Sequence, residues 1–139
     1  MTLSIAGKTA IVTGSAKGIG LAIARHFVDL GANVMFADID EARLESELGE
    51  AAQEDGPLRY FAGDLSQKLT AANLLSATVD AFDRIDILVN ANRDFAITDP
   101  LNPEDPAFDM LLRQNMLCAV RLTQMVARRM ITQAERDGQ

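Results

Sequence analysis

The sequence contains one cysteine, one histidine and one tyrosine, and it has no tryptophan. With Cys118 alone, the chain cannot form an internal disulfide bond, which is typical of proteins in a reducing compartment. Lys and Arg number 13 against 20 Asp and Glu, so the formal net charge is −7 at pH 7. An acidic chain without a basic cluster is poorly suited to nucleic acid or an anionic membrane surface. We therefore expect neither as a partner.

Long hydrophobic runs are also absent. No run approaches the roughly 20 residues of a membrane-spanning helix, and the N-terminus lacks the basic and apolar regions of a signal peptide. The composition, 48% hydrophobic and 24% charged, is that of a globular protein. A chain of 139 residues suffices for one domain with a core. We expect a single cytoplasmic domain over residues 1–139 with no metal site, because Cys118 and His26 have no accompanying ligand set.

Short apolar runs alternate with longer amphipathic stretches along the chain. The runs predict strands at Thr9–Thr13, Asn33–Asp38, Leu58–Ala62 and 85–90. Asp40 and the pair Asp105-Pro106 have the chemistry of helix starts, with Asp105 as N-cap and Pro106 as the first helical residue of a last long helix that runs to about Ala134. The third helix is expected to open at Ser66. Apolar residues at helical spacing are expected to face the core in each of the first three helices: Ile19, Ile23, Phe27 and Leu30 in the first; Leu44, Leu48, Ala51 and Ala52 in the second; and Ala72, Leu75, Val79 and Phe82 in the third.

This alternation of strands and helices predicts an α/β fold, a parallel sheet covered by helices on both faces. Right-handed crossovers then give a Rossmann-like, doubly wound sheet with strand order 3-2-1-4. The first and fourth strands lie side by side, and their connections leave in opposite directions. A ligand is expected in the crevice at the carboxyl ends of these two strands.

The segment 13–20, "TGSAKGIG", lies at that crevice, between the first strand and the first helix. Its glycines Gly14, Gly18 and Gly20 permit a tight turn and a close approach of a diphosphate to the backbone. The helix N-terminus adds free N–H groups and a partial positive charge. An ordinary glycine turn is the alternative, and the position inside a strand–loop–helix unit favours the binding loop.

The same eight residues resemble the TGxxxGxG fingerprint of the short-chain dehydrogenase/reductase family. The resemblance implies that the loop binds a nicotinamide dinucleotide through Gly14, Ser15, Lys17, Gly18, Ile19 and Gly20. Asp38, at the end of the second strand, matches the ribose-binding acid of that family. A carboxylate there accepts bonds from both ribose hydroxyls and repels a 2′-phosphate, which favours NAD over NADP. Lys17 argues weakly for NADP, because a basic residue here meets the 2′-phosphate in NADP-using relatives.

Three further positions extend the resemblance. The pair Asp64-Leu65 is similar to the "D-[LV]" pair that contacts adenine, although a helix-entry turn would explain it equally well. Asn90 matches the first position of the NNAG motif, after which the chain departs from the motif and places Arg93 at the glycine. That cation would either crowd the cofactor or pair with a phosphate. Asn115 matches by position the asparagine of the catalytic Asn-Ser-Tyr-Lys set, which supports the lysine through water; a helix-surface asparagine is the alternative.

The serine and the Tyr-x-x-x-Lys of that set are missing, since Tyr60 is followed four residues later by Asp64. We therefore expect a chain truncated before a fifth strand, carrying only the cofactor-binding half of the family's domain. The strand 85–90 would be an apolar sheet edge. The last helix is apolar around much of its circumference and predicts a homo-oligomer or another covering chain, through Phe108, Leu111, Leu112, Met116, Val120, Met125 and Ile131.

The resemblance implies an oxidoreductase that transfers a hydride between a nicotinamide and a small alcohol or carbonyl substrate. The general acid/base pair is missing, so the 139-residue chain alone is expected to be inactive. A non-catalytic module that binds NAD or senses it for regulation is the alternative. A third possibility, suggested by Arg93, is a remnant that binds nothing.

Overall fold

The computed structural model describes residues 3–53 and 55–138. Within these ranges, a single parallel sheet has the strand order β3-β2-β1-β4, which confirms the predicted α/β fold. The strands are β1 (Thr9–Thr13), β2 (Asn33–Asp38), β3 (Leu58–Ala62) and β4 (Ile87–Asn90). Thr13 pairs with both Ala37 and Asn90, so the carboxyl ends of β1, β2 and β4 lie level at one edge.

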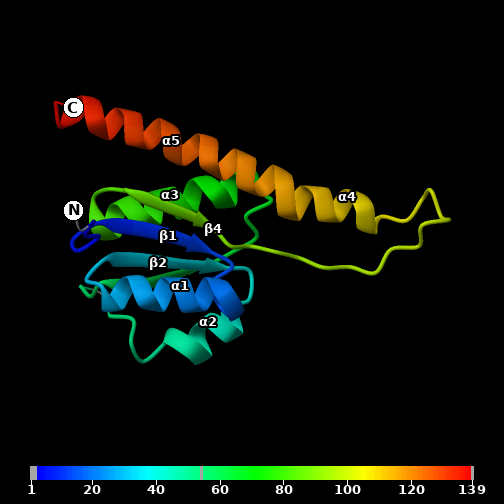
Figure 1. Ribbon diagram of the computed structural model, residues 1–139, viewed down its shortest axis with the longest axis horizontal. Helices are drawn as coiled ribbons and strands as arrows, with labels where there is room; N and C mark the ends of the chain where they lie inside the picture. Colours follow the sequence, from blue (N-terminus) through cyan, green and yellow to red (C-terminus); the bar gives the residue numbers. More distant parts are fainter. Residues whose placement is uncertain (1–2, 54, 139) are drawn as a thin grey trace.

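Helices cover both faces of this sheet (Figure 1). One face is packed by α1 (Gly18–Asp29) and α2 (Glu41–Leu48), the other by α3 (Lys68–Phe82) and α5 (Cys118–Arg136). Side chains alternate across β1 accordingly. Ala10 and Val12 join the core on the α1 and α2 side, and Ile11 joins the core on the α3 and α5 side. This two-sided burial explains why the strands read as continuous apolar runs.

Several predicted boundaries are wrong. The last helix is not uninterrupted: α4 (Ala107–Leu112) and α5 are joined by a π-helical segment, η1 (Arg113–Leu117). β4 begins at Ile87 rather than Ile85, because the backbone of Ile85 bonds to the side chain of Gln133 instead of a neighbouring strand. The first residue of α3 is Lys68, since Asp64 holds Ser66 in a turn before the helix. α2 ends at Leu48, so Ala51 and Ala52 lie beyond it.

The buried helix faces also differ from the predicted ones. α1 buries Leu21 and Ala24, whereas Ile19 and Leu30 are exposed. α3 buries Ala71, Leu74 and Thr78, and its predicted apolar positions are only partly buried. Both helices carry apolar residues over a wide arc, so periodicity alone does not fix their rotation. The predicted start of α2 is confirmed, since Asp40 is its N-cap and accepts a bond from Arg43 N at 3.0 Å. The predicted start of α4 is one residue early: Pro106 is the N-cap and the helix begins at Ala107, whose N–H bonds to Asp105 at 2.9 Å.

The segment 91–106 leaves the carboxyl end of β4 as an irregular arm and returns into α4 (Figure 1). Apolar side chains stay exposed along α4, η1 and α5, including Phe108, Leu112, Met116, Val120 and Ile131; Leu111 and Met125 are partly buried. β4 is one of the two edge strands of the sheet, and its residues Ile87, Leu88 and Val89 are only partly buried. Among the helices of the described residues, none has the length and hydropathy to span a bilayer. The proposed oligomer contact through the last helix stays a prediction.

Candidate functional site

The glycine loop joins the carboxyl end of β1 to the first turn of α1. Gly14 and Gly18 have φ of +63° and +60°, a backbone conformation that side chains with a Cβ rarely adopt. Lys17 precedes α1 without a side-chain capping bond, and the first turn of α1 has no acidic residue. The first N–H groups of this helix therefore lack the side-chain acceptor that a capping residue would supply. They and the helix dipole favour an anion at this point.

The three glycines serve different geometric ends. A Cβ at Gly14 would lie 2.7 Å from the carbonyl oxygen of Ala91 and the Cα of Asn92, so this glycine lets the loop touch the chain after β4. A Cβ at Gly20 would overlap the carbonyl oxygen of Gly14. A Cβ at Gly18 would meet nothing within 4 Å. Gly18 thus leaves free the space above the helix N-terminus, where a ligand would approach the backbone.

Ser15 and Asp38 tie this loop to β2. The Ser15 hydroxyl donates to Val12 O at 2.8 Å and accepts from Ala37 N at 2.9 Å. Asp38 accepts bonds from Ala16 N and Asp40 N, both at 3.0 Å. Ser15 is fully buried and its N–H bonds to Ala37 O, so its side chain supports the loop from inside. A part for Ser15 in cofactor binding stays a prediction.

An open cleft of about 800 Å³ lies between the carboxyl ends of β1 and β4. This is the point where the strand order reverses, the position expected for a ligand in a doubly wound sheet. The cleft brings together most of the residues predicted for the site: Gly14, Lys17, Gly18, Ile19, Gly20, Asp38, Asn90 and Asn115. The structure thus places residues from four separate sequence segments around one space.

Asp64 and Leu65 line a smaller adjoining pocket that shares Gly14 and Asp38 with the cleft. The Asp64 carboxylate accepts bonds from Ser66 N at 3.0 Å and Ser66 Oγ at 2.7 Å. Burial raises the pKa of Asp64, but hydrogen bonds from Ser66, Gln114 and Gln67 outweigh it and lower the pKa below its ordinary value. The pair therefore does form a helix-entry turn, and that turn borders the site.

The β4 side of the cleft is held by short polar contacts. Thr13 Oγ1 accepts a bond from Ala91 N at 3.2 Å, which fastens the end of β4 to β1. Asn90 Nδ2 donates to Thr123 Oγ1 at 3.0 Å on α5. Asn115 pairs with the backbone of Asp94: its Oδ1 accepts from Asp94 N at 2.8 Å, and its Nδ2 donates to Asp94 O at 3.1 Å.

Asn115 lies in the π-helical segment η1, a kind of distortion that is frequent at functional sites. Its side chain holds the arm after β4 in place. The predicted supporting role toward a catalytic lysine would therefore have to operate through groups other than this amide, and it stays a prediction.

Ile39, Arg93 and Phe95 are among the cleft-lining residues that the sequence does not assign to the cofactor site, and for Arg93 it leaves open whether the cation crowds the cofactor or pairs with a phosphate. Ile39 comes directly after Asp38 and is 63% exposed, which its place just after a strand end could have signalled. Arg93 departs from the family motif, and that departure is the one signal it carries. Its guanidinium lies 4.5 Å from the centroid of the Phe95 ring. Phe95 carries no sequence signal, because it lies in the irregular arm.

Other reactive side chains do not converge. Within residues 3–53 and 55–138, no group of three or more His, Cys, Asp and Glu residues could hold a metal ion. Cys118 is buried against the α3 and α5 core, and burial raises the pKa of its thiol, with a further contribution from Asp64. His26 lies exposed in the last turn of α1.

Comparison with known proteins identifies relatives of this chain. A protein-family model described as short chain dehydrogenase matches residues 8–139. Short chain dehydrogenase/reductase dpchG of Colletotrichum higginsianum is 33% identical over 138 residues, which cover 96% of this chain and 50% of that protein. L-fucose dehydrogenase of Rattus norvegicus is 38% identical over 123 residues, which cover 86% of this chain and 43% of that protein.

Among solved structures, the crystal structure of 3-ketoacyl-(acyl-carrier-protein) reductase from Brucella melitensis complexed with NADH is similar, with a TM-score of 0.82 and 27% identity. The similarity covers 98% of this chain and 55% of that one. The chain thus spans about half the length of these relatives.

Proposed function

This chain belongs to the short chain dehydrogenase family, and we propose that its cleft binds NAD as the cofactor-binding half of an oxidoreductase. Family members use NAD(P)(H), and the similar reductase structure was solved with NADH. The observation that carries the proposal is the geometry at Gly18. Its φ of +60°, the open space beside it and the uncapped start of α1 together form a cradle into which a diphosphate fits.

Asp38 supports NAD over NADP. Its two carboxylate oxygens each accept one backbone N–H, which fixes the side chain at the rim of the cleft. A carboxylate oxygen can accept more than one hydrogen bond, so lone pairs remain for two ribose hydroxyls. A 2′-phosphate in the same place would meet a fixed negative charge. Lys17, exposed on the same cleft, offsets only part of that charge.

For the whole oxidoreductase we propose hydride transfer between the nicotinamide and a small alcohol or carbonyl compound. The family resemblance supports this, and the cofactor itself supplies the hydride chemistry. The chain lacks Tyr-x-x-x-Lys, so the proton donor would come from sequence outside these 139 residues. We accordingly expect no dehydrogenase turnover from the 139-residue chain. Turnover by pure material of verified mass would contradict this.

A non-catalytic module that binds NAD or senses it for regulation is the second candidate. The two candidates share the cleft and differ in the reading frame beyond Gln139. A frame that continues into a serine and a Tyr-x-x-x-Lys supports the oxidoreductase. A stop codon after Gln139, combined with NAD binding and no turnover, supports the module.

Calorimetric titration with NAD and NADP tests the cofactor assignment. We expect the wild-type chain to prefer NAD, and Asp38→Ala to weaken NAD binding by at least about tenfold, since two hydrogen bonds to a charged acceptor are lost. Asp38→Asn should bind NADP better than wild type, because it removes the repulsion while keeping an acceptor. Asp29→Ala, an exposed carboxylate at the far end of α1, is the control. Unchanged selectivity in both Asp38 variants would refute the assignment.

A further inference from the structure

Arg93 directly follows the residues of the chain that pack against the glycine loop. Gly14 packs against the backbone of Ala91 and Asn92 so closely that its missing Cβ would lie 2.7 Å from the Asn92 Cα. The Arg93 Cα is one residue further, about 3.8 Å along the chain. Arg93 also lines the cleft together with Gly18. The base of this long side chain therefore lies beside the point where the two walls of the cleft meet.

Phe95 holds the guanidinium of Arg93 without using its N–H donors. The guanidinium lies 4.5 Å from the ring centroid, which is a cation–π contact, and Phe95 is itself 79% exposed. No carboxylate in the described part of the chain forms an ion pair with Arg93. A stacked, planar guanidinium keeps a fixed fork of N–H groups for an anion.

The carboxylates around the cleft are Asp38, Asp40 and Asp94. Asp38 accepts two backbone amides, and Asp40 caps α2 through Arg43 N. Asp94 is the next residue after Arg93, yet its backbone is held by Asn115 and its carboxylate lies outside ion-pair distance of Arg93. The guanidinium is thus a cation that faces the cleft without a counter-charge among the described residues.

We propose that Arg93 binds the diphosphate of the cofactor from the β4 side of the cleft, opposite the glycine loop. The inference rests on the proposed function and deepens it, because it assigns a phosphate-binding role to a residue that stands where the family motif has glycine. Guanidinium and phosphate match in geometry as well as charge, since two N–H groups can meet two oxygens. The opposing account, in which Arg93 crowds the cleft, makes the opposite prediction for its removal.

Titration of ADP-ribose and adenosine separates the two accounts. We expect Arg93→Gln and Arg93→Gly to weaken ADP-ribose binding by about two- to fivefold at low salt, the upper part of the range of an exposed charge pair. Adenosine, which has no phosphate, should bind equally to all variants. Arg93→Lys should recover part of the loss. The difference between wild type and Arg93→Gln should shrink as salt is raised, because screening weakens exposed charge pairs.

Arg93 is not buried, so these variants should keep the wild-type melting temperature, which circular dichroism checks. ADP-ribose binding that is unchanged or tighter in Arg93→Gly would overturn the inference in favour of crowding and leave the proposed function standing. If the wild-type chain binds neither ADP-ribose nor NAD, the proposed function itself fails, and the inference fails with it.

Discussion

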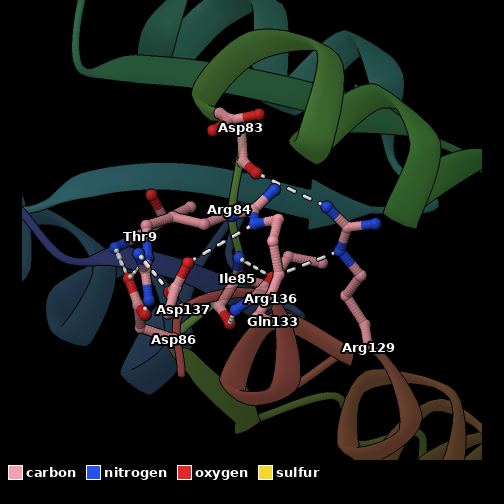
Figure 2. A network of polar contacts seen from close by, with 9 residues as sticks. All are labelled: Thr9, Asp83, Arg84, Ile85, Asp86, Arg129, Gln133, Arg136 and Asp137. Atoms are coloured by element: carbon pink, nitrogen blue, oxygen red, sulfur yellow. Dashed lines mark hydrogen bonds and ion pairs between the residues drawn. The ribbon is translucent and has the colours of Figure 1, made fainter. Parts of the chain in front are cut away.

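The two ends of the sheet are built in different ways. At the carboxyl ends of the strands, side chains bind backbone groups and shape a loop around an open cleft. At the amino ends, side chains bind one another as well as the backbone, and they join the starts of β1 and β4 to the ends of α3 and α5 (Figure 2). The carboxyl ends of the strands leave polar groups free for a ligand, whereas the contacts at the amino ends hold α5 to the sheet.

Gln133 is the centre of the fastened end. Its side chain is buried and pairs with the backbone of Ile85: Oε1 accepts from Ile85 N at 2.9 Å, and Nε2 donates to Ile85 O at 2.8 Å (Figure 2). Arg84 binds Asp86 at 2.9 Å and Asp137 at 3.4 Å, and Asp86 also accepts a bond from Thr9 N at 2.9 Å. The Gln133 side chain thus makes the hydrogen bonds to the N–H and C=O of Ile85 that a neighbouring strand would otherwise make.

Stability and ligand binding thus depend on opposite ends of the sheet. Arg84 has its counter-charges inside the chain, and Asp86, with a further contribution from Asp137, raises its pKa above the ordinary value. Arg93, at the other end, has none among the described residues. Substitutions at the fastened end should therefore lower stability and spare cofactor binding. Substitutions that face the cleft should weaken cofactor binding and change stability little, except at the glycines of the loop, whose backbone conformation or packing does not admit a Cβ.

The largest effect is expected from that exception. Gly14→Ala places a Cβ against the backbone at Ala91 and Asn92 and should lower the free energy of unfolding by about 3 kcal/mol or more, because strained backbone adds to a clash that cannot relax. Gly18→Ala has nearly the same φ but no clash. It should cost about 1–2 kcal/mol and weaken NAD binding. Urea denaturation of Gly14→Ala and Gly18→Ala checks this prediction, and equal losses in the free energy of unfolding would contradict it.

The second-largest loss of stability is expected from Gln133→Leu. This substitution removes both side-chain bonds to Ile85 and leaves the N–H and C=O of Ile85 buried without partners. We expect a loss of about 2–4 kcal/mol in the free energy of unfolding, with NAD affinity unchanged. Gln124→Leu, on the exposed side of the same helix, is the control. A Gln133 variant with wild-type stability would show that the amino end does not fasten α5.

A smaller effect is expected at Asp64, where hydrogen bonds lower the pKa of the carboxyl group. A lowered pKa stabilises the folded state above the ordinary value of 3.8 and ceases to do so as the pH falls through the folded-state value. Asp64→Asn should therefore be less stable than wild type at pH 7, by about 1 kcal/mol or less for a partly buried group that solvent still screens. The difference should vanish toward pH 2. Melting curves recorded between pH 7 and pH 2 check this prediction, with Asp80→Asn on α3 as the control.

The sequence predicts the sheet order because strand–helix alternation and crossover handedness are local and general rules. It predicts about half of the cleft lining because the glycine loop and the strand ends converge in any doubly wound sheet. The sequence does not predict the features that depend on contacts between residues far apart in the chain. Gln133 binds Ile85 across 48 positions and shortens β4, and Asn115 binds Asp94 from within a π-helical segment that no periodicity marks. Phe95 lies in an arm without regular structure and has no pattern to read.

Hydrogen exchange measured with and without NAD is the most direct test of the division between the two ends of the sheet. In this account, the carboxyl ends of the strands bind the cofactor and the amino ends hold α5 to the sheet. Saturating NAD should slow amide exchange in residues 14–20, 38–40 and 90–95 and leave 84–86 and 129–137 unchanged beyond any uniform stabilisation by the ligand. Absence of protection at 14–20, or protection concentrated at 84–86 and 129–137, would contradict the account.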